Sequence, residues 1–120
     1  QVIFRNTGEF PVEISRPDAE AYINNVFARS VSALKVGRCI YNFFLYYDGG
    51  MITDGAMLRL SDECLWMVQA DGELTKWYKA HAYQFDVKIT DPNVWVIQMQ
   101  GPKSLDVLSD LIGGDFPKIR

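Results

Sequence analysis

The chain has 120 residues, and 48% of them are hydrophobic and 13% aromatic, which suits a folded domain with a core and excludes a disordered chain. Twelve basic and fifteen acidic side chains leave a formal net charge of −3. This balance supplies neither the basic footprint of a nucleic-acid-binding domain nor a polybasic membrane patch, and no apolar run is long enough for a transmembrane helix. We therefore expect one domain over residues 1–120, with no nucleic-acid or membrane partner.

The first third of the chain predicts two short strands followed by a helix. The strands are expected over residues 2–5 and 10–15, and in the second Val12 and Ile14 alternate with Glu13 and Ser15. Pro17 suits the first turn of the helix. The apolar residues after it recur at the spacing of one buried helical face: Ala19, Tyr22, Ile23, Val26 and Phe27.

The stretch from residue 41 to residue 58 predicts an antiparallel hairpin. An aromatic run ends at Tyr47, and the returning strand begins at Met51. Between them, Asp48-Gly49-Gly50 forms the turn, because glycine accepts the positive φ that tight hairpin turns require. A third strand is expected over residues 64–69.

The last part of the chain predicts two more helices and two more strands. In order, these are a helix over 72–83 capped by Asp71, strands over 85–90 and 94–99, and a helix from Pro102 to Ile112 that Gly113-Gly114 ends. The resulting order, β-β-α-β-β-β-α-β-β-α, favours an α+β fold with a mainly antiparallel sheet and about three helices.

The cysteines and the single histidine argue against metal chemistry. Cys39 and Cys64 are isolated, and we expect free, buried thiols of a cytoplasmic protein. One histidine cannot build a His-rich metal site, so His81 is expected to pack on a helix face beside Trp77 and Tyr78, and no metal is expected. The tryptophans are all expected in the core: Trp66, Trp77 and Trp95.

Asp54 is the residue of the hairpin that does not suit a strand. Strands disfavour aspartate, and a buried carboxylate needs hydrogen-bond partners. Asp54 therefore either faces solvent or is placed for chemistry, and both readings stay open. The same holds for the hairpin tyrosines, which either belong to the core or line a pocket for a flat ligand: Tyr41, Tyr46 and Tyr47.

Four segments resemble, in the same order, motifs of the folate-binding domain of glycine-cleavage T-protein-like aminomethyltransferases. That superfamily includes dimethylsulfoniopropionate demethylase and tetrahydrofolate-dependent O-demethylases. The segments are Arg16-Pro17-Asp18-Ala19, Leu34-Lys35-Val36-Gly37-Arg38 with Tyr41, Gly49-Gly50-Met51-Ile52-Thr53-Asp54, and Gln100-Gly101-Pro102 with Ser104. The third resembles the Gly-Gly-x-x-Asp-Asp signature of the family.

The resemblance implies transfer of a methyl or aminomethyl group from a small substrate to tetrahydrofolate. It implies that Asp54 is the catalytic residue and contacts the folate, that Tyr41 lines the folate pocket, and that Gln69 also lies near the folate. The chemistry suits Asp54, because a partly desolvated carboxylate on a strand can hydrogen-bond a folate nitrogen, stabilise positive charge or move a proton.

The chain also departs from the family pattern. Thr53 replaces the first acid of the signature, which favours the demethylase and dehydrogenase-linked relatives over a strict glycine-cleavage T-protein. Complete members are considerably longer, so the chain resembles an N-terminal piece that is inactive without the remaining domains of its parent. Two alternatives stay open: a non-catalytic folate-binding module of the iron–sulfur-cluster assembly and repair type, and a stand-alone domain with a structural or interaction role.

Overall fold

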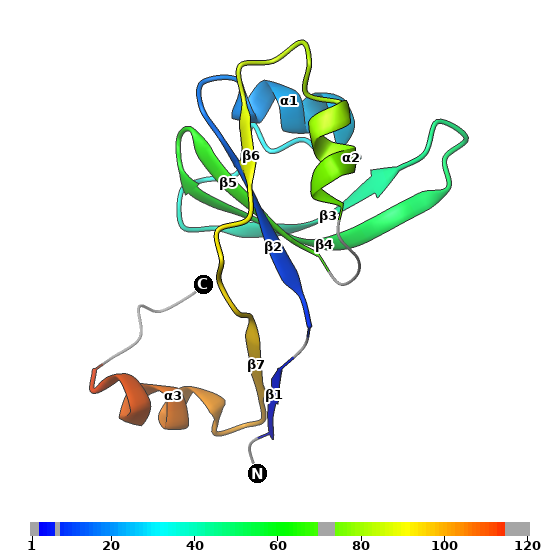
Figure 1. The fold of residues 1–120 in the computed structure, drawn as a ribbon. Helices are drawn as coiled ribbons and strands as arrows, with labels where there is room; N and C mark the ends of the chain where they lie inside the picture. Colours follow the sequence, from blue (N-terminus) through cyan, green and yellow to red (C-terminus); the bar gives the residue numbers. More distant parts are fainter. Residues whose placement is uncertain (1–2, 7, 70–73, 115–120) are drawn as a thin grey trace. The chain divides into compact units, whose positions relative to one another are not determined.

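A computed structural model describes residues 3–6, 8–69 and 74–114. The chain divides into two compact units, one formed by residues 8–96 and the other by residues 1–7 together with 97–120 (Figure 1). The expectation of one domain stays a prediction. No described helix is both long and apolar enough to cross a membrane.

The larger unit contains a five-stranded sheet and two helices. The strands lie in the order β3-β4-β5-β2-β6, and every neighbouring pair is antiparallel. In chain order the elements are β2 (Phe10–Ser15), α1 (Ala19–Val26), β3 (Cys39–Leu45), β4 (Met51–Ser61), β5 (Cys64–Gln69), α2 (Thr75–Ala80) and β6 (Lys88–Thr90).

The smaller unit pairs the two ends of the chain. Strand β1 (Ile3–Asn6) runs antiparallel to β7 (Ile97–Gln100), and α3 (Ser104–Ile112) follows. Helix α3 ends at Gly113, whose φ is +68° and whose N–H donates to the Ser109 carbonyl at 3.0 Å. Glycine adopts this left-handed conformation without strain, so the predicted helix stop is confirmed.

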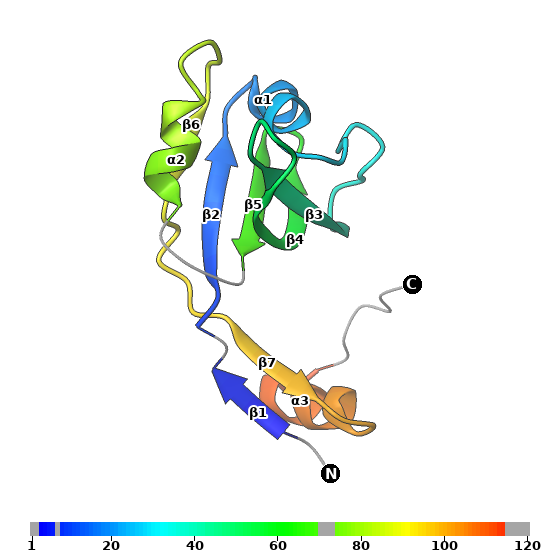
Figure 2. The same cartoon turned by 90° about the vertical axis from the view of Figure 1, so that its right-hand side faces the viewer.

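The core of the larger unit lies between its sheet and its helices. Figure 1 shows α1 and α2 together above the sheet, and Figure 2 shows α2 beside β6. Tyr22 of α1 is fully buried and donates its hydroxyl to the Tyr78 carbonyl of α2 at 2.8 Å, which ties the two helices together. The strands contribute alternate side chains to this core: Val12, Ile14, Phe44, Met57, Leu65 and Met67.

The α+β class, the mainly antiparallel sheet and the hairpin are confirmed. Strands β3 and β4 pair across the predicted turn, where the Tyr46 N–H donates to the Gly50 carbonyl at 2.7 Å. Gly49 has a φ of +86°, the conformation for which the turn needs glycine.

Several element boundaries differ from the prediction. The first helix begins at Ala19, after Pro17, and the predicted cap Asp71 lies outside the described residues. Helix α2 is shorter than expected, because the Phe85 N–H bonds to Ala82 and the Val87 N–H bonds to Phe85 in successive turns. The same turns delay β6, and β7 also begins later than the sequence indicated.

Two burial predictions were wrong. Cys39 and Cys64 are free thiols, but Cys39 is exposed and Cys64 is only half-buried. Both lie on the sheet face that points away from the helices, because Cys39 alternates with the buried residues of β3 and Cys64 with those of β5. Trp95 is 74% exposed and Trp77 is 37% exposed, so neither belongs to the buried core.

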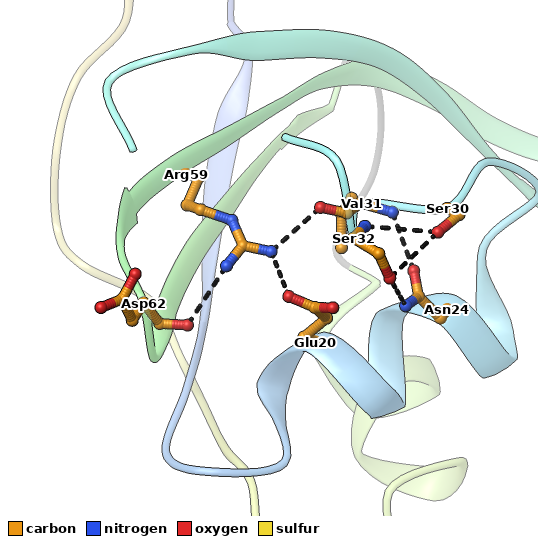
Figure 3. A network of polar contacts seen from close by, with 7 residues as sticks. All are labelled: Glu20, Asn24, Ser30, Val31, Ser32, Arg59 and Asp62. Carbon is orange, nitrogen blue, oxygen red and sulfur yellow. Dashed lines mark hydrogen bonds and ion pairs between the residues drawn. The ribbon is translucent and has the colours of Figure 1, made fainter. Parts of the chain in front are cut away.

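A buried arginine joins three parts of the larger unit, as Figure 3 shows. Arg59 of β4 is 6% exposed, and its guanidinium donates to the Glu20 carboxylate of α1 at 2.5 Å. It also donates to the carbonyls of Val31 at 3.0 Å and Asp62 at 3.4 Å. One side chain therefore links β4 to α1, to the loop after α1 and to the turn before β5.

The Glu20 carboxylate is held in its ionised form by this network. Hydrogen bonds from Arg59 and then Ser32 lower its pKa, and partial burial opposes them. Because the folded-state pKa is depressed, the stability from Glu20 is present above the ordinary glutamate pKa and is lost as pH falls through the lowered pKa. Asn24 supports the same loop, since its side chain accepts from the Val31 N–H at 2.8 Å and donates to Ser32 at 2.9 Å.

We expect Arg59→Lys to lower the free energy of unfolding by about 1.5–3 kcal/mol, the usual loss when a charged hydrogen bond is broken in a buried site. Lysine keeps the charge but cannot reproduce the planar fork that reaches Glu20, Val31 and Asp62 together. Urea unfolding is the suitable measurement, because guanidinium chloride screens ion pairs.

The matched control is Arg16→Lys. Arg16 bonds Asp86 at 3.0 Å, but both side chains are more than half exposed. An exposed pair contributes about 0–1 kcal/mol, so this change should be nearly silent. Equal losses of unfolding free energy in the two variants would show that burial does not strengthen the interactions of Arg59.

Candidate functional site

Tyr41 and Asp54 meet on the face of the sheet that points away from the helices. The β3–β4 register pairs Phe43 with Asp54 and Tyr41 with Ala56, so Tyr41 and Asp54 are diagonal neighbours. The Tyr41 hydroxyl donates to Oδ2 of Asp54. Side chains alternate along a strand, and the next residue, Asn42, is fully buried on the opposite face.

Aromatic rings flank the carboxylate. Tyr41 is 50% exposed, and its ring lies edge-to-face with that of Phe43, with centroids 5.2 Å apart. Asp54 itself is half-buried. We call Tyr41, Phe43 and Asp54 the acid–aromatic surface: a carboxylate held by a hydroxyl beside rings on which a planar ligand can lie.

The carboxylate changes the acidity of its partner. The hydrogen bond to Asp54 raises the pKa of the Tyr41 phenol, and burial and the negative charge of Asp54 act in the same direction. The raised pKa means that the contact stabilises the fold below the ordinary tyrosine pKa and is lost as pH rises through the raised value.

A close approach of two strands sets the position of Asp54. Gly55 follows Asp54 on β4 and pairs with Gln69 of β5. A Cβ on Gly55 would lie 2.0 Å from the Val68 carbonyl oxygen and 3.0 Å from the Gln69 Cα. Only glycine allows this spacing, so the backbone beside Asp54 depends on it.

Gln69 lies away from the acid–aromatic surface. It is 1% exposed on the helix-covered face of β5, and its Oε1 accepts the Tyr78 hydroxyl at 2.5 Å. Asp54 is on the other face of the sheet, so the structure brings together Tyr41 and Asp54 but not Gln69. The folate contact expected for Gln69 stays a prediction.

The other hairpin tyrosines line a separate cavity of about 210 Å³. We call it the aromatic cavity, and its rings are Phe44, Tyr46, Tyr47, Trp77 and His81. Tyr41 lies with Asp54 and not with Tyr46 and Tyr47, so the expectation that the three hairpin tyrosines line one pocket is wrong. His81 packs with its ring centroid 5.2 Å from that of Trp77, as expected from their spacing on one helix.

Phe43 is a residue of this surface that was not predicted, although its place on the strand carries a usable signal. Phe43 is two residues from Tyr41, so it shares the Tyr41 face, and it pairs directly with Asp54. Within the described part of the chain, no group of three or more histidine, cysteine, aspartate or glutamate side chains could hold a metal ion.

The fold and the acid–aromatic surface define a small α+β module with a carboxylate on an open sheet face. Residues 4–118 match the family described as the GCVT N-terminal domain. The chain belongs to this family.

The relatives support the same assignment. Dimethylsulfoniopropionate demethylase from Ruegeria pomeroyi is 30% identical over 93% of this chain, and an aminomethyltransferase from Thermotoga maritima is 32% identical over 93%. The aminomethyltransferase T of the glycine cleavage system from Bartonella henselae has the same fold, with a TM-score of 0.87 and 18% identity over 98% of this chain. The chain spans 31%, 32% and 33% of these proteins, respectively.

We expect Asp54→Asn to lower the pKa of Tyr41, because the neutral amide stabilises the protonated phenol less than the carboxylate does. Absorbance titration of phenolate near alkaline pH measures the change. Burial raises the pKa of Tyr22 and Tyr78 much further, so these two do not obscure Tyr41. Tyr41→Phe identifies the signal, and Asp62→Asn is the matched control. An unchanged Tyr41 titration in Asp54→Asn would refute the contact.

We expect Gly55→Ala to lower the free energy of unfolding by about 1–3 kcal/mol, since the added methyl forces β4 and β5 apart. Gly114→Ala is the control, because a Cβ there meets nothing within 4 Å. Chemical unfolding compares the two variants. Equal stability of Gly55→Ala and the parent chain would contradict the close approach.

Proposed function

We propose that this chain is the N-terminal part of an enzyme that transfers a methyl or aminomethyl group from a small donor to tetrahydrofolate, with Asp54 as the catalytic residue. The observation that carries the proposal is the Tyr41–Asp54 hydrogen bond on the open face of the sheet. Family membership supports the class of reaction.

The residues of the acid–aromatic surface suit a reduced folate. The rings of Tyr41 and Phe43 offer apolar contact to a planar bicyclic ring, and the Asp54 carboxylate offers an acceptor to a ring N–H. When bound, tetrahydrofolate supplies the nitrogens that receive the one-carbon unit. Tyr41 and Asp54 would therefore hold it, and its pocket also needs walls from the rest of the parent protein, because binding sites enclose most of their ligand.

Each residue then has a distinct task. Tyr41 donates to Oδ2 of Asp54 and fixes the orientation of the carboxylate, so that Oδ1 is presented to the ligand. Asp54 would accept a hydrogen bond from the folate nitrogen that receives the one-carbon unit and would stabilise the positive charge there while the bond from that carbon to the donor heteroatom breaks and the heteroatom leaves with the electron pair. Its carboxylate could then take the proton that the nitrogen releases. This stabilisation is strongest in the transition state, so it acts on turnover more than on binding.

Thr53 supports a proposal for the class of one-carbon donor. This residue occupies the first acid position of the family signature, which favours the demethylase and dehydrogenase-linked relatives. The curated relatives include a dimethylsulfoniopropionate demethylase and a trimethylamine-oxide aldolase, which match 93% and 83% of this chain. A small methylated donor is accordingly the first class to test.

The non-catalytic alternative, a folate-binding module of the iron–sulfur-cluster type, finds no support in the comparisons. The relatives described above carry enzyme names, and the match to the family covers nearly all of the chain. The isolated 120-residue piece is still expected to be inactive, because it spans about a third of those relatives.

We expect Asp54→Asn in the full-length enzyme to lower turnover by about 10²–10⁴-fold, the usual contribution of a positioned acid or base. Tetrahydrofolate affinity should fall less, by about tenfold, which corresponds to one charged hydrogen bond. Single-turnover formation of methylated or methylene tetrahydrofolate, followed by mass spectrometry with dimethylsulfoniopropionate and dimethylglycine as donors, separates the two effects.

Asp62→Asn serves as the matched control, since it makes the same change on an exposed turn of the same sheet. Its turnover should equal that of the parent enzyme. If Asp54→Asn transfers the one-carbon unit at the parent rate in a single turnover, Asp54 is a structural strand residue and the proposed mechanism fails.

A further inference from the structure

The aromatic cavity lies where the hairpin meets the two helices of the larger unit. Phe44, Tyr46 and Tyr47 come from the end of β3 and the turn after it, and Trp77 and His81 come from α2. Asn25 and Val26, at the end of α1, close the third side. Its volume of about 210 Å³ is below the roughly 300–1,000 Å³ of pockets for drug-sized ligands, so a fitting ligand is small.

Neighbouring rings of the aromatic cavity meet at steep angles. Tyr46 and Trp77 are inclined at 83°, with centroids 5.8 Å apart, and Phe44 and Trp77 are inclined at 85°. Tyr47 and His81 are inclined at 62°. A flat ligand is best held between parallel faces, whereas rings that meet at steep angles form a corner that suits a compact, nearly spherical group.

The cavity also suits positive charge. Aromatic faces carry the negative part of the ring quadrupole, and tryptophan and tyrosine attract cations most strongly. Helix α1 ends at this cavity with no basic residue in its last turn, so its carbonyl end adds a partial negative charge. The eight described lining residues include no lysine, arginine, aspartate or glutamate.

We propose that the aromatic cavity is a binding site for a small methylated ammonium group. The trimethylated nitrogen would sit against Trp77, Tyr46 and Tyr47, and its methyl groups would replace water in the corner between the rings. The rings of these residues are accessible to a ligand, because Trp77 is 37% exposed, Tyr46 is 50% exposed and Tyr47 is 97% exposed.

This site is separate from the acid–aromatic surface. Tyr41 and Phe43 point to the open face of β3, whereas Phe44 is 2% exposed on the helix-covered face. Beyond a register shift between Phe44 and Leu45, Tyr46 contacts Trp77 of α2. An experiment that rules out ligand binding at one site therefore does not rule out the function proposed for the other.

The test compares two probes of nearly the same shape in the full natural chain. Choline carries a trimethylammonium group, and 3,3-dimethylbutan-1-ol carries a neutral tert-butyl group in its place. Ligand-observed NMR should give choline a dissociation constant of about 1–10 mM, typical of a small ligand. The neutral probe should bind at least about fivefold more weakly, because it lacks the cation–π attraction.

Substitutions of tryptophan test whether choline binds in the aromatic cavity. Trp77→Leu should weaken choline at least about fivefold, and Trp77→Phe should weaken it less, because a smaller ring face remains. Trp95→Leu is the matched control, since Trp95 is exposed and does not line this cavity. Circular dichroism confirms that each variant is folded.

Three results would overturn the proposal: equal binding of choline and the neutral probe, unchanged choline binding in folded Trp77→Leu, or no saturable choline binding up to about 50 mM, well beyond the expected range. Tighter binding of a neutral planar ring such as benzamide would assign the cavity to flat ligands instead.

Discussion

The buried guanidinium of Arg59 joins separate parts of the larger unit to one strand of its sheet. Arg59 belongs to β4, the strand that carries Asp54, and it hydrogen-bonds to α1, to the loop after α1 and to the turn before β5 (Figure 3). A buried charge is costly unless it is paired and hydrogen-bonded, so these partners must come together as a set. Any change that slid β4 along its neighbours would separate Arg59 from Glu20. The pair therefore fixes the register of the strand as well as its packing.

This register decides which chemistry each face of the sheet carries. Along β4, Thr53, Met57 and Arg59 are buried against the helices, and Asp54 and Ala56 point the other way. A slip of one residue would reverse this arrangement and bury the Asp54 carboxylate. Gly55 has no Cβ, so β5 can approach closely beside it. A slip of β4 would place a residue with a Cβ at this point, where the Val68 carbonyl leaves no room for it. The structural constraints of Arg59 and Gly55 and the carboxylate proposed for catalysis therefore lie on the same strand.

The hairpin could be predicted because its determinants are local. Asp48-Gly49-Gly50 defines the turn, and the aromatic run before it favours a strand. The Tyr41–Asp54 contact could not be derived from periodicity alone, because a diagonal pair depends on the exact register; only the family resemblance connected the two residues. Arg59 carries no local signal either, since two of its partners, Glu20 and Val31, are distant in sequence. The grouping of Tyr41 with Tyr46 and Tyr47 failed because side chains alternate along a strand: Phe44 and Tyr46 contact Trp77 of α2, whereas Tyr41 faces the other way.

The replacement of the first signature acid by Thr53 has a structural explanation. Thr53 is 6% exposed and lies on the helix-covered face, so its side chain cannot reach a ligand that contacts Asp54. An aspartate at this position would place a carboxylate among Phe44 and Met57 and would need its own partners there. The two signature positions thus have different roles in this fold, one in the interior and one on the open face. Threonine at the first position is therefore compatible with an intact acid–aromatic surface.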